Sequence, residues 1–440
     1  MSGVEIAAVS FVVFLALVVV RVPIALAMLL CGVVGTTILT GSDRAVLASF
    51  KSLAYSTFGN YTLTIVPLFL LMGQFASKGG ISESLFRAAN AFLGHRPGGI
   101  AMAAVGASAG FGAVSGSSIA TAATMGKVSL PEMRRFGYAG SISTGSVAAG
   151  GTLGILIPPS FVLVIYAILS EQNIDKLFIA AIVPGVLAAL GYIATIGIVA
   201  RLKPELAPRH ERASWSKRLR ALVDIWPVLL IFIVVIGGIY WGWFSPTEAA
   251  AVGAVATALI ALLNGGLTIR TFFESLRETA VTTGMIFFIV LGAAAYNTFL
   301  ALAGLPDSLA ELVLSTSANP FLIVGVILLI YLVLGTVMDS LSMILLTVPI
   351  FFPLVMGLDF GLTPDETAIW FGILVLIAVE VGLITPPVGM NLFIINSMSG
   401  GVPISQTYRG VLPFIASDII RTLLLLAFPV VTLGLVRLLY

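Results

Sequence analysis

The chain has 440 residues, of which 59% are hydrophobic and 10% are charged, and its mean hydropathy is +1.12. A soluble globular protein carries roughly 25% charged residues, so this composition indicates a polytopic membrane protein with room for about a dozen spans. The net charge of +2 gives no support for binding nucleic acid, and the single cysteine excludes an intrachain disulfide.

The N-terminal half begins with predicted spans and membrane-surface segments. The spans are expected at residues 4–20, 24–39 and 61–75, and the surface segments at 41–59 and 78–96. Residues 98–124 are apolar but interrupted at 112–118, so neither flank is long enough to cross a bilayer. We expect a re-entrant helical hairpin there, with its tip buried in protein or lining a cavity. Residues 136–169, broken at 150–159, are expected to form one discontinuous span.

The C-terminal half repeats this pattern after four uninterrupted segments. These spans are expected at residues 177–200, 222–241, 248–263 and 281–303. Residues 319–352 are then interrupted at 335–341, residues 368–396 are interrupted at 382–387, and a last span is expected at 419–438. The predicted fold is therefore an all-α polytopic membrane protein with two re-entrant helical hairpins and two discontinuous helices, as in transporters built from internal repeats.

Loop charge predicts the orientation of these spans. The polar loop 201–220 holds seven Lys or Arg residues, which favours a cytoplasmic location. Threading the spans outward from this loop puts both termini on the periplasmic side. The first hairpin then enters from the cytoplasm and the second from the periplasm, so the two halves are predicted to be inverted repeats.

The interruptions carry the residues with binding chemistry. Both broken spans contain Gly-x-x-x-Pro-Pro, and the prolines lack amide donors, which leaves upstream carbonyls unpaired. Unpaired carbonyls and hydroxyls can ligate a hard cation such as sodium, whereas helix N-termini suit an anionic group. A single interruption is commonly no more than a kink or packing site, but four in inverted register favour a functional site.

Two acidic residues lie deep in apolar segments, where a charge costs roughly 2.5–3.5 kcal/mol on insertion scales. Asp339 lies on an interruption, so a ligand or gating role is expected. Glu380 precedes the last interruption without an evident basic neighbour and is expected to be protonated or to bond a helix end. All five tryptophans, including Trp370, lie near predicted span ends, which is typical of an aromatic belt.

Other functional classes have weaker support. An intramembrane serine protease would need a base near Ser115, but neither histidine lies in an apolar segment, and no HExxH or Cys/His cluster is present. An ATP-driven pump is excluded for this chain alone because GxxxxGK[ST] is missing. A channel is the remaining alternative. Flux through a channel is not coupled to another ion, whereas uptake by a transporter is saturable and ion-dependent.

Three motifs resemble those of the large membrane subunit of TRAP transporters. They are residues 112–121 (GAVSGSSIAT), followed by PEM at 131–133 and GY at 137–138; residues 148–160 (AAGGTLGILIPPS); and residues 385–393 (TPPVGMNLF). The second and third motifs are highly specific, and the resemblance covers essentially the whole chain.

The resemblance implies a tripartite ATP-independent periplasmic system and not an enzyme. Such a system combines a periplasmic substrate-binding protein, a small four-helix membrane subunit and this large subunit in the bacterial inner membrane. It takes up an organic acid, such as a sialic acid or a C4-dicarboxylate, with two or more Na⁺ ions and no other cofactor. The implied fold is that of the ion-transporter superfamily, in which a transport body moves as an elevator. The small subunit is expected at the first three spans or at those after Arg220.

The resemblance also assigns site residues. The first sodium site would use Ser115, Gly116, Ser117, Ser118, Gly150, Gly151, Thr152 and Pro158. The second would use Gly335, Thr336, Val337, Asp339, Gly382, Thr385 and Pro386. The substrate is expected near Ser117, Ser340 and Asn391. The predicted transport part covers residues 97–176 and 319–398, the scaffold covers 1–96 and 177–318 with the loop 201–220, and residues 399–440 hold a surface segment and the last span.

Overall fold

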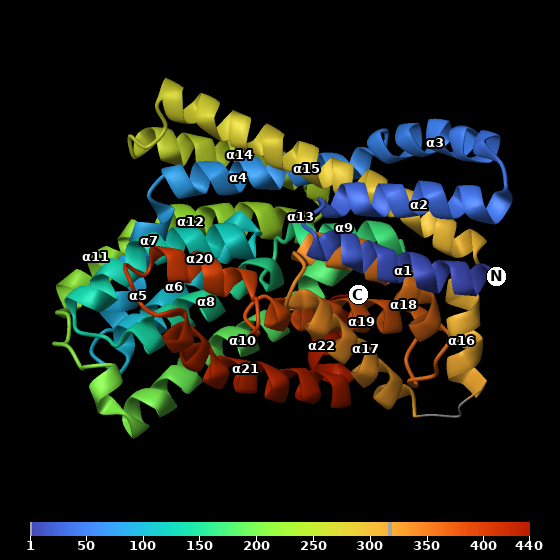
Figure 1. Ribbon diagram of the computed structural model, residues 1–440. Helices are drawn as coiled ribbons and strands as arrows, with labels where there is room; N and C mark the ends of the chain where they lie inside the picture. Colours follow the sequence, from blue (N-terminus) through green and yellow to red (C-terminus); the bar gives the residue numbers. More distant parts are fainter. Residues whose placement is uncertain (1, 316–318) are drawn as a thin grey trace.

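The computed structural model describes residues 2–315 and 319–440, with the backbone alone at 43–47, 49–50 and 312–315 (Figure 1). The last three residues of the predicted scaffold segment 177–318 therefore lie outside the described residues. Every regular element in the described part of the chain is a helix, which confirms the predicted all-α class.

The N-terminal half contains eleven helical elements before the basic loop. They are α1 (Gly3–Val19), α2 (Ile24–Thr40), α3 (Asp43–Phe58), η1 (Tyr61–Thr64), α4 (Ile65–Lys78), α5 (Ile81–Leu93), α6 (Gly99–Ser115), α7 (Ser118–Arg135), α8 (Gly140–Leu156), α9 (Phe161–Ser170) and α10 (Ile174–Leu202).

The C-terminal half begins with a short turn inside the basic loop. Its elements are η2 (Pro204–Leu206), α11 (Trp215–Asp224), α12 (Trp226–Phe232), η3 (Ile233–Gly237), α13 (Gly238–Tyr240), α14 (Pro246–Leu263), α15 (Ile269–Leu302), α16 (Leu305–Ser315), α17 (Pro320–Gly335), α18 (Ser340–Met356), α19 (Pro364–Gly382), α20 (Met390–Met398), α21 (Ile404–Ala427) and α22 (Pro429–Leu439).

Several of these helices suit a bilayer. Within the described residues, four helices are long and apolar enough to cross a membrane, namely α10, α14, α15 and α21. The number rises to seven when each bent helix pair counts as one span. One such pair is α8 with α9, which are bent by 44° at the first predicted broken span. The helices α6, α17 and α18 are apolar but shorter.

The helices form two packed groups (Figure 1). In the first, α15 packs along α2 and α4, and α14 packs on α4. In the second, α8 packs against α6, α7, α10 and α21, while α19 packs against α17 and α18. Small residues allow close approach in the first group: a Cβ built on Gly32 would lie 2.8 Å from the backbone of Ala295.

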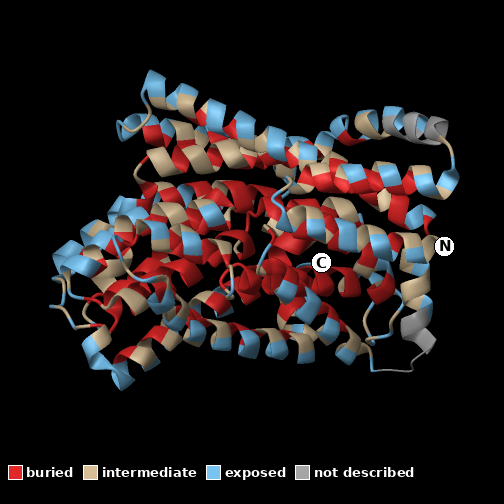
Figure 2. Cartoon of the chain, viewed as in Figure 1, coloured by how far each residue is buried: buried red, intermediate tan, exposed pale blue. Residues whose placement is uncertain are grey.

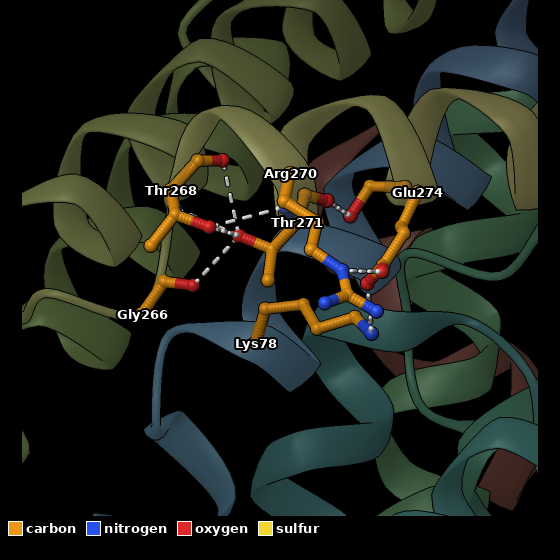
Figure 3. Close-up of polar contacts among 7 residues, drawn as sticks. Lys78, Gly266, Thr268, Arg270, Thr271 and Glu274 are labelled. Atoms are coloured by element: carbon orange, nitrogen blue, oxygen red, sulfur yellow. Dashed lines mark hydrogen bonds and ion pairs between the residues drawn. The ribbon is translucent and has the colours of Figure 1, made fainter.

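Polar contacts at one end of the first group fix the start of α15 (Figure 3). Thr268 and Thr271 cap the helix reciprocally, since each side-chain oxygen accepts the other residue's backbone N–H, at 3.2 and 2.7 Å. The Glu274 carboxylate accepts a hydrogen bond from Arg270 at 2.9 Å and lies 3.8 Å from Lys78 Nζ at the end of α4. The C-terminal end of α4 and the start of α15 therefore lie at the same side.

The two broken helices form the core of the second group. Figure 2 shows their burial: every residue from Ile142 to Leu156 in α8 and from Thr367 to Gly382 in α19 is buried. A helix buried on all sides carries no polar face, which matches the Gly- and Ala-rich sequence of α8 and the apolar run in α19.

Two sequence-based expectations are wrong. The last span was expected at 419–438, but α21 runs from Ile404 through Pro413 to Ala427, and a new helix begins at Pro429 because the residue before a proline disfavours helical backbone. Trp370 is not part of an aromatic belt: it is fully buried, and its indole N–H donates to Leu425 O at 3.0 Å.

Candidate functional site

The first candidate site starts at the turn between α6 and α7. Gly116 takes a left-handed backbone conformation with φ of 62°, which glycine adopts without steric cost, so the chain reverses within two residues. Ser117 then caps α7, because its Oγ accepts the Ala120 N–H at 3.3 Å. The buried Ser115 and Thr121 hydroxyls lie 2.8 Å apart. The turn therefore presents serine hydroxyls beside a helix N-terminus.

Glycines let this turn dock directly on α8. A Cβ built on Gly154 would lie 2.5 Å from Ser117 O, and one on Gly151 would lie 2.9 Å from Ala122 Cα. Real Cβ atoms do not approach this closely, so side chains at these positions would force α7 and α8 apart. A Cβ on Gly116 would lie 3.1 Å from Pro159 O. The α6–α7 turn thus meets the break in the α8–α9 pair.

The break after α8 starts later than predicted. The helix continues through Gly150, Gly151 and Thr152 to Leu156, and Ile157 turns extended with ψ of 122°. Pro158 explains this position, because a proline disfavours helical backbone in the residue before it. The peptide bond between Pro158 and Pro159 is cis. The last carbonyls of α8 therefore end beside the turn, and these are the carbonyls that an α-helix leaves without intrahelical partners.

The second candidate site uses the same packing. The ends of α17 and α19 meet through two glycines, since a Cβ on Gly382 would lie 2.6 Å from Gly335 Cα. Thr336 O, in the turn after α17, accepts the Gly389 N–H at 3.1 Å from the break after α19. The turn and the break of this half are therefore joined by a hydrogen bond as well as by packing.

Asp339 is a helix cap. Its Oδ2 accepts the N–H groups of Leu341 and Ser342, both at 3.1 Å, and Ser342 Oγ also donates to the carboxylate. A carboxylate at the first turn of a helix is favoured by the positive end of the helix dipole. The Thr385 hydroxyl donates to Val381 O at 2.7 Å. A role of either side chain in sodium binding stays a prediction.

Asn391 links the two halves. Its backbone N–H donates to Leu383 O at 3.1 Å, and its side-chain amide donates to Ala148 O in α8 at 3.4 Å. The side chain is fully buried, and its Oδ1 has no hydrogen-bond partner within the described residues. Its helix, α20, packs on α7 and α8. The second break therefore reaches the first site, but no described contact joins Ser340 to Ser117 or to Asn391.

A buried cluster of charged and polar residues lies beside α8, near the first break, and was not predicted from the sequence. Arg421 Nη2 lies 3.1 Å from Glu380 Oε2 and 2.9 Å from Asp418 Oδ1. The Tyr192 hydroxyl donates to Asp418 Oδ2 at 2.7 Å and lies 3.3 Å from Thr152 Oγ1. All five residues are buried. We name these five residues the charge cluster; it joins α8, α10, α19 and α21.

The charge cluster corrects one expectation. Glu380 has a basic neighbour after all, because Arg421 lies within α21 and pairs with it. The pair is separated by 41 positions, so only the packing of α21 on α19 brings it together. One signal was available: Asp418 and Arg421 stand three positions apart in an apolar segment, and ionisable residues in membranes pair with one another.

Packing around the charge cluster also concerns the predicted division of the chain into a transport part and a scaffold. The side chain of Thr152 points to Tyr192 on α10, whereas the neighbouring Gly151 faces Ala122 of α7. The helices α10 and α21 pack on α8 and α19. Residues 177–200 were grouped with the scaffold, but α10 packs on α6, α8 and α19 of the predicted transport part and on α21 and α22 of the segment 399–440. The division into moving and fixed parts stays a prediction.

Comparison with known proteins identifies relatives over nearly the whole chain. The family model for the tripartite ATP-independent periplasmic transporter, DctM component, matches residues 11–431. The chain is 40% identical over 392 residues to the C4-dicarboxylate TRAP transporter large permease protein DctM of Pseudomonas aeruginosa, covering 88% of this chain and 90% of the relative. It is 33% identical over 375 residues to the sialic acid TRAP transporter large permease protein SiaM of Vibrio cholerae, covering 85% and 86%.

The fold is also similar to a solved transporter structure. The YdaH transporter of Alcanivorax borkumensis superposes with a TM-score of 0.62 over 88% of each chain. The sequence identity is 15%, so this likeness concerns the fold alone.

Proposed function

The chain belongs to the DctM component family of tripartite ATP-independent periplasmic transporters, and we propose that it is the large permease subunit of a sodium-coupled carboxylate uptake system. The protein is accordingly a multi-pass membrane transporter and not an enzyme. The observation that carries the proposal is the family match over residues 11–431, which includes both turn-and-break pairs. The substrate class follows from relatives named for C4-dicarboxylates and sialic acid.

Sodium is the coupling ion in this proposal, with at least one ion at each turn-and-break pair and no other cofactor. The support is the donor set: the helix ends at each pair offer backbone carbonyls, and hydroxyls lie in the same turns or breaks at Ser115 and Ser117 in one half and at Thr336 and Thr385 in the other. Carbonyls and hydroxyls are hard oxygen ligands that suit a small cation, and unwound helix ends at mid-membrane commonly provide them.

The carboxylate substrate binds between the two sites, near Ser117, Ser340 and Asn391. Support comes from helix polarity, because α7 and α18 both begin at the turns and direct positive dipole ends there. The buried Asn391 Oδ1 also supports this position. It has no hydrogen-bond partner within the described residues, so it is free to accept a hydrogen bond from a ligand.

Transport follows an elevator mechanism in this proposal. The helices α6–α9 and α17–α20 carry the sites and move together with α10, α21 and α22, which pack on them. The helices α1–α4 with α12–α15 form the scaffold, and the two packed groups support this division. The α6–α7 and α17–α18 pairs are re-entrant hairpins of inverted repeats. Figure 1 supports this by placing α6 and α7 at one end of the molecule and α17 and α18 at the other. The basic loop 201–220 faces the cytoplasm and both termini face the periplasm.

The partners are a periplasmic substrate-binding protein and a small four-helix membrane subunit in the bacterial inner membrane. The small subunit docks on the scaffold, where side chains such as Val12 and Val19 of α1 are 66% and 79% exposed. Exposed apolar side chains of a membrane protein face either lipid or another subunit, so this surface is suited to helix–helix packing.

The test is uptake into proteoliposomes that contain this chain, the small subunit and the loaded binding protein. We expect uptake to require an inward sodium gradient and to saturate with substrate. Asp339→Asn should raise the sodium concentration needed for half-maximal uptake, whereas Asp359→Asn, in a loop outside both sites, should not. Equal uptake in potassium refutes sodium coupling, and non-saturable flux without the binding protein indicates a channel.

A further inference from the structure

The helices α10 and α21 cross closely and then separate. At the crossing, a Cβ built on Gly191 would lie 3.0 Å from Ser417 Oγ, and the next residue on each helix joins the Tyr192–Asp418 hydrogen bond. Beyond this point, α10 continues to its C-terminal end and α21 extends back to its N-terminal end. A cavity of about 700 Å³ lies between these two ends. We name it the fork cavity.

The fork cavity has an apolar inner wall. Ile196 and Val199 line it from α10, and Pro413 and Phe414 line it from α21. Ile196 and Phe414 are buried, so this wall belongs to the packed interior. The spacing of three to four positions along each helix puts the lining side chains on facing stripes. This part of the cavity suits hydrocarbon rather than water.

The outer end of the fork cavity is polar and basic. Lys203 lies just after α10, and Arg409 and Gln406 lie in the first turns of α21. Lys203 and Arg409 are exposed, and neither has an ion pair among the described side chains. Glu205 is the acidic residue in the lining, so two positive charges face one negative charge. The adjoining loop 201–220 adds further bases, which makes this end attractive to anions.

The flanks of the fork cavity face the bilayer. Ile198 and Leu202 on α10 are 58% and 76% exposed, and Leu412 on α21 is 55% exposed. Apolar side chains exposed along membrane-spanning helices contact acyl chains. The basic end lies where α10 ends and α21 begins, which is the level of lipid head groups for two spanning helices.

We propose that the fork cavity binds an anionic phospholipid from the leaflet on the side of the 201–220 loop. The phosphate interacts with Lys203 and Arg409, and Gln406 supplies a neutral hydrogen-bond donor beside them. The acyl chains enter along the apolar wall and continue over the exposed stripes of α10 and α21. An amphiphile satisfies both ends of the cavity, whereas a soluble anion satisfies the basic end alone. Basic pockets between helices at the cytoplasmic side of a membrane are a recurring mode of lipid recognition.

The test is native mass spectrometry of the full chain released from mixed micelles containing phosphatidylglycerol or phosphatidylethanolamine. We expect phosphatidylglycerol to remain bound and phosphatidylethanolamine to be retained less. Lys203→Gln/Arg409→Gln removes both cavity bases and should weaken phosphatidylglycerol binding about 10- to 30-fold. Each base near a lipid surface raises the affinity for an anionic lipid by a factor of roughly five. The control, Arg212→Gln/Arg220→Gln, removes two bases of the same loop that do not line the cavity, so its phosphatidylglycerol binding should fall much less than that of Lys203→Gln/Arg409→Gln.

A second variant separates charge from space. Val199→Trp puts a large ring into the apolar part of the cavity and leaves both bases in place, so it should also weaken lipid binding. Equal binding of the two lipids, an unchanged Lys203→Gln/Arg409→Gln variant, or retention in Val199→Trp would each overturn the proposal. Displacement of the lipid by inorganic phosphate alone would assign the site to a soluble anion instead. None of these results depends on sodium coupling or on uptake, so the proposed transport function is tested separately.

Discussion

Replacing Arg421 by methionine should destabilise the protein strongly. The guanidinium is the one positive group of the charge cluster, where it lies 3.1 Å from Glu380 and 2.9 Å from Asp418. Without it, two carboxylates remain buried together with no cation. Removing one partner of a buried ion pair costs about 3–5 kcal/mol, because the other charge stays desolvated and unpaired. For a chain of 440 residues, a cost of this size corresponds to a fall in Tm of about 3–5 °C.

The assay is thermal unfolding of the purified full chain in detergent, followed by intrinsic fluorescence. The matched control is Arg437→Met, which breaks another Arg–Glu pair, with Arg437 Nε 2.6 Å from Glu366 Oε1. Those side chains are 45% and 20% exposed, so water and salt screen the pair. Its loss should cost below about 1 kcal/mol. An Arg421→Met variant no less stable than Arg437→Met would refute the reasoning.

A variant with an uncharged cluster tests why Arg421→Met is unstable. In Glu380→Gln/Asp418→Asn/Arg421→Met, no buried charge is left unpaired, and the amide at position 418 still accepts the Tyr192 hydrogen bond. Replacing a whole buried ion cluster by neutral groups is often nearly neutral for stability. We therefore expect the triple variant to recover most of the Tm lost in Arg421→Met. A triple variant as unstable as the single one would show that lost packing, and not the unpaired carboxylates, causes the loss.

Two further predictions concern packing and pH. Gly382→Ala should sharply lower folded yield, because its Cβ would lie 2.6 Å from Gly335 Cα, whereas Gly434→Ala meets nothing within 4 Å and should be neutral or stabilising; size-exclusion profiles of both variants check this. The Arg437 guanidinium holds the pKa of the Glu366 carboxyl below its usual value of 4.5. Because the folded-state pKa is depressed, the pair's stabilisation is present above pH 4.5 and is lost as the pH falls through the folded pKa. Glu366→Gln should therefore lower Tm slightly at pH 7 and have no effect in acid; an equal effect at both pH values would contradict the assignment.

The helix breaks could be predicted because their causes are local. Two adjacent prolines remove amide donors, and Gly116 permits the left-handed turn that ends α6; both signals are visible in the chain itself. The error in the first break was small, since the glycines at 150 and 151 serve packing against α6 and α7 rather than flexibility. Composition alone does not distinguish these two uses of glycine.

The charge cluster could not be predicted with the same means. Glu380 and Arg421 lie on different helices, and their pairing depends on how α21 packs on α19. The polar residues at the start of α21 suggested a surface segment, because burial by other helices has no local signature. The prediction that Trp370 belongs to an aromatic belt was wrong for the same reason. Proximity to a predicted span end does not show whether another helix covers the ring.

The charge cluster also occupies a distinctive position relative to both breaks. In each half a glycine that packs on the turn begins the Gly-x-x-x-Pro-Pro motif, Gly154 in the first and Gly382 in the second. Thr152 and Glu380 stand two positions before these glycines and are therefore equivalent, and both side chains join the charge cluster. If the two halves are the inverted repeats proposed above, such equivalent residues meet because they lie near the axis that relates the repeats. The charge cluster therefore stands two positions before the motif glycine in each half, so the two proposed sodium sites share one support.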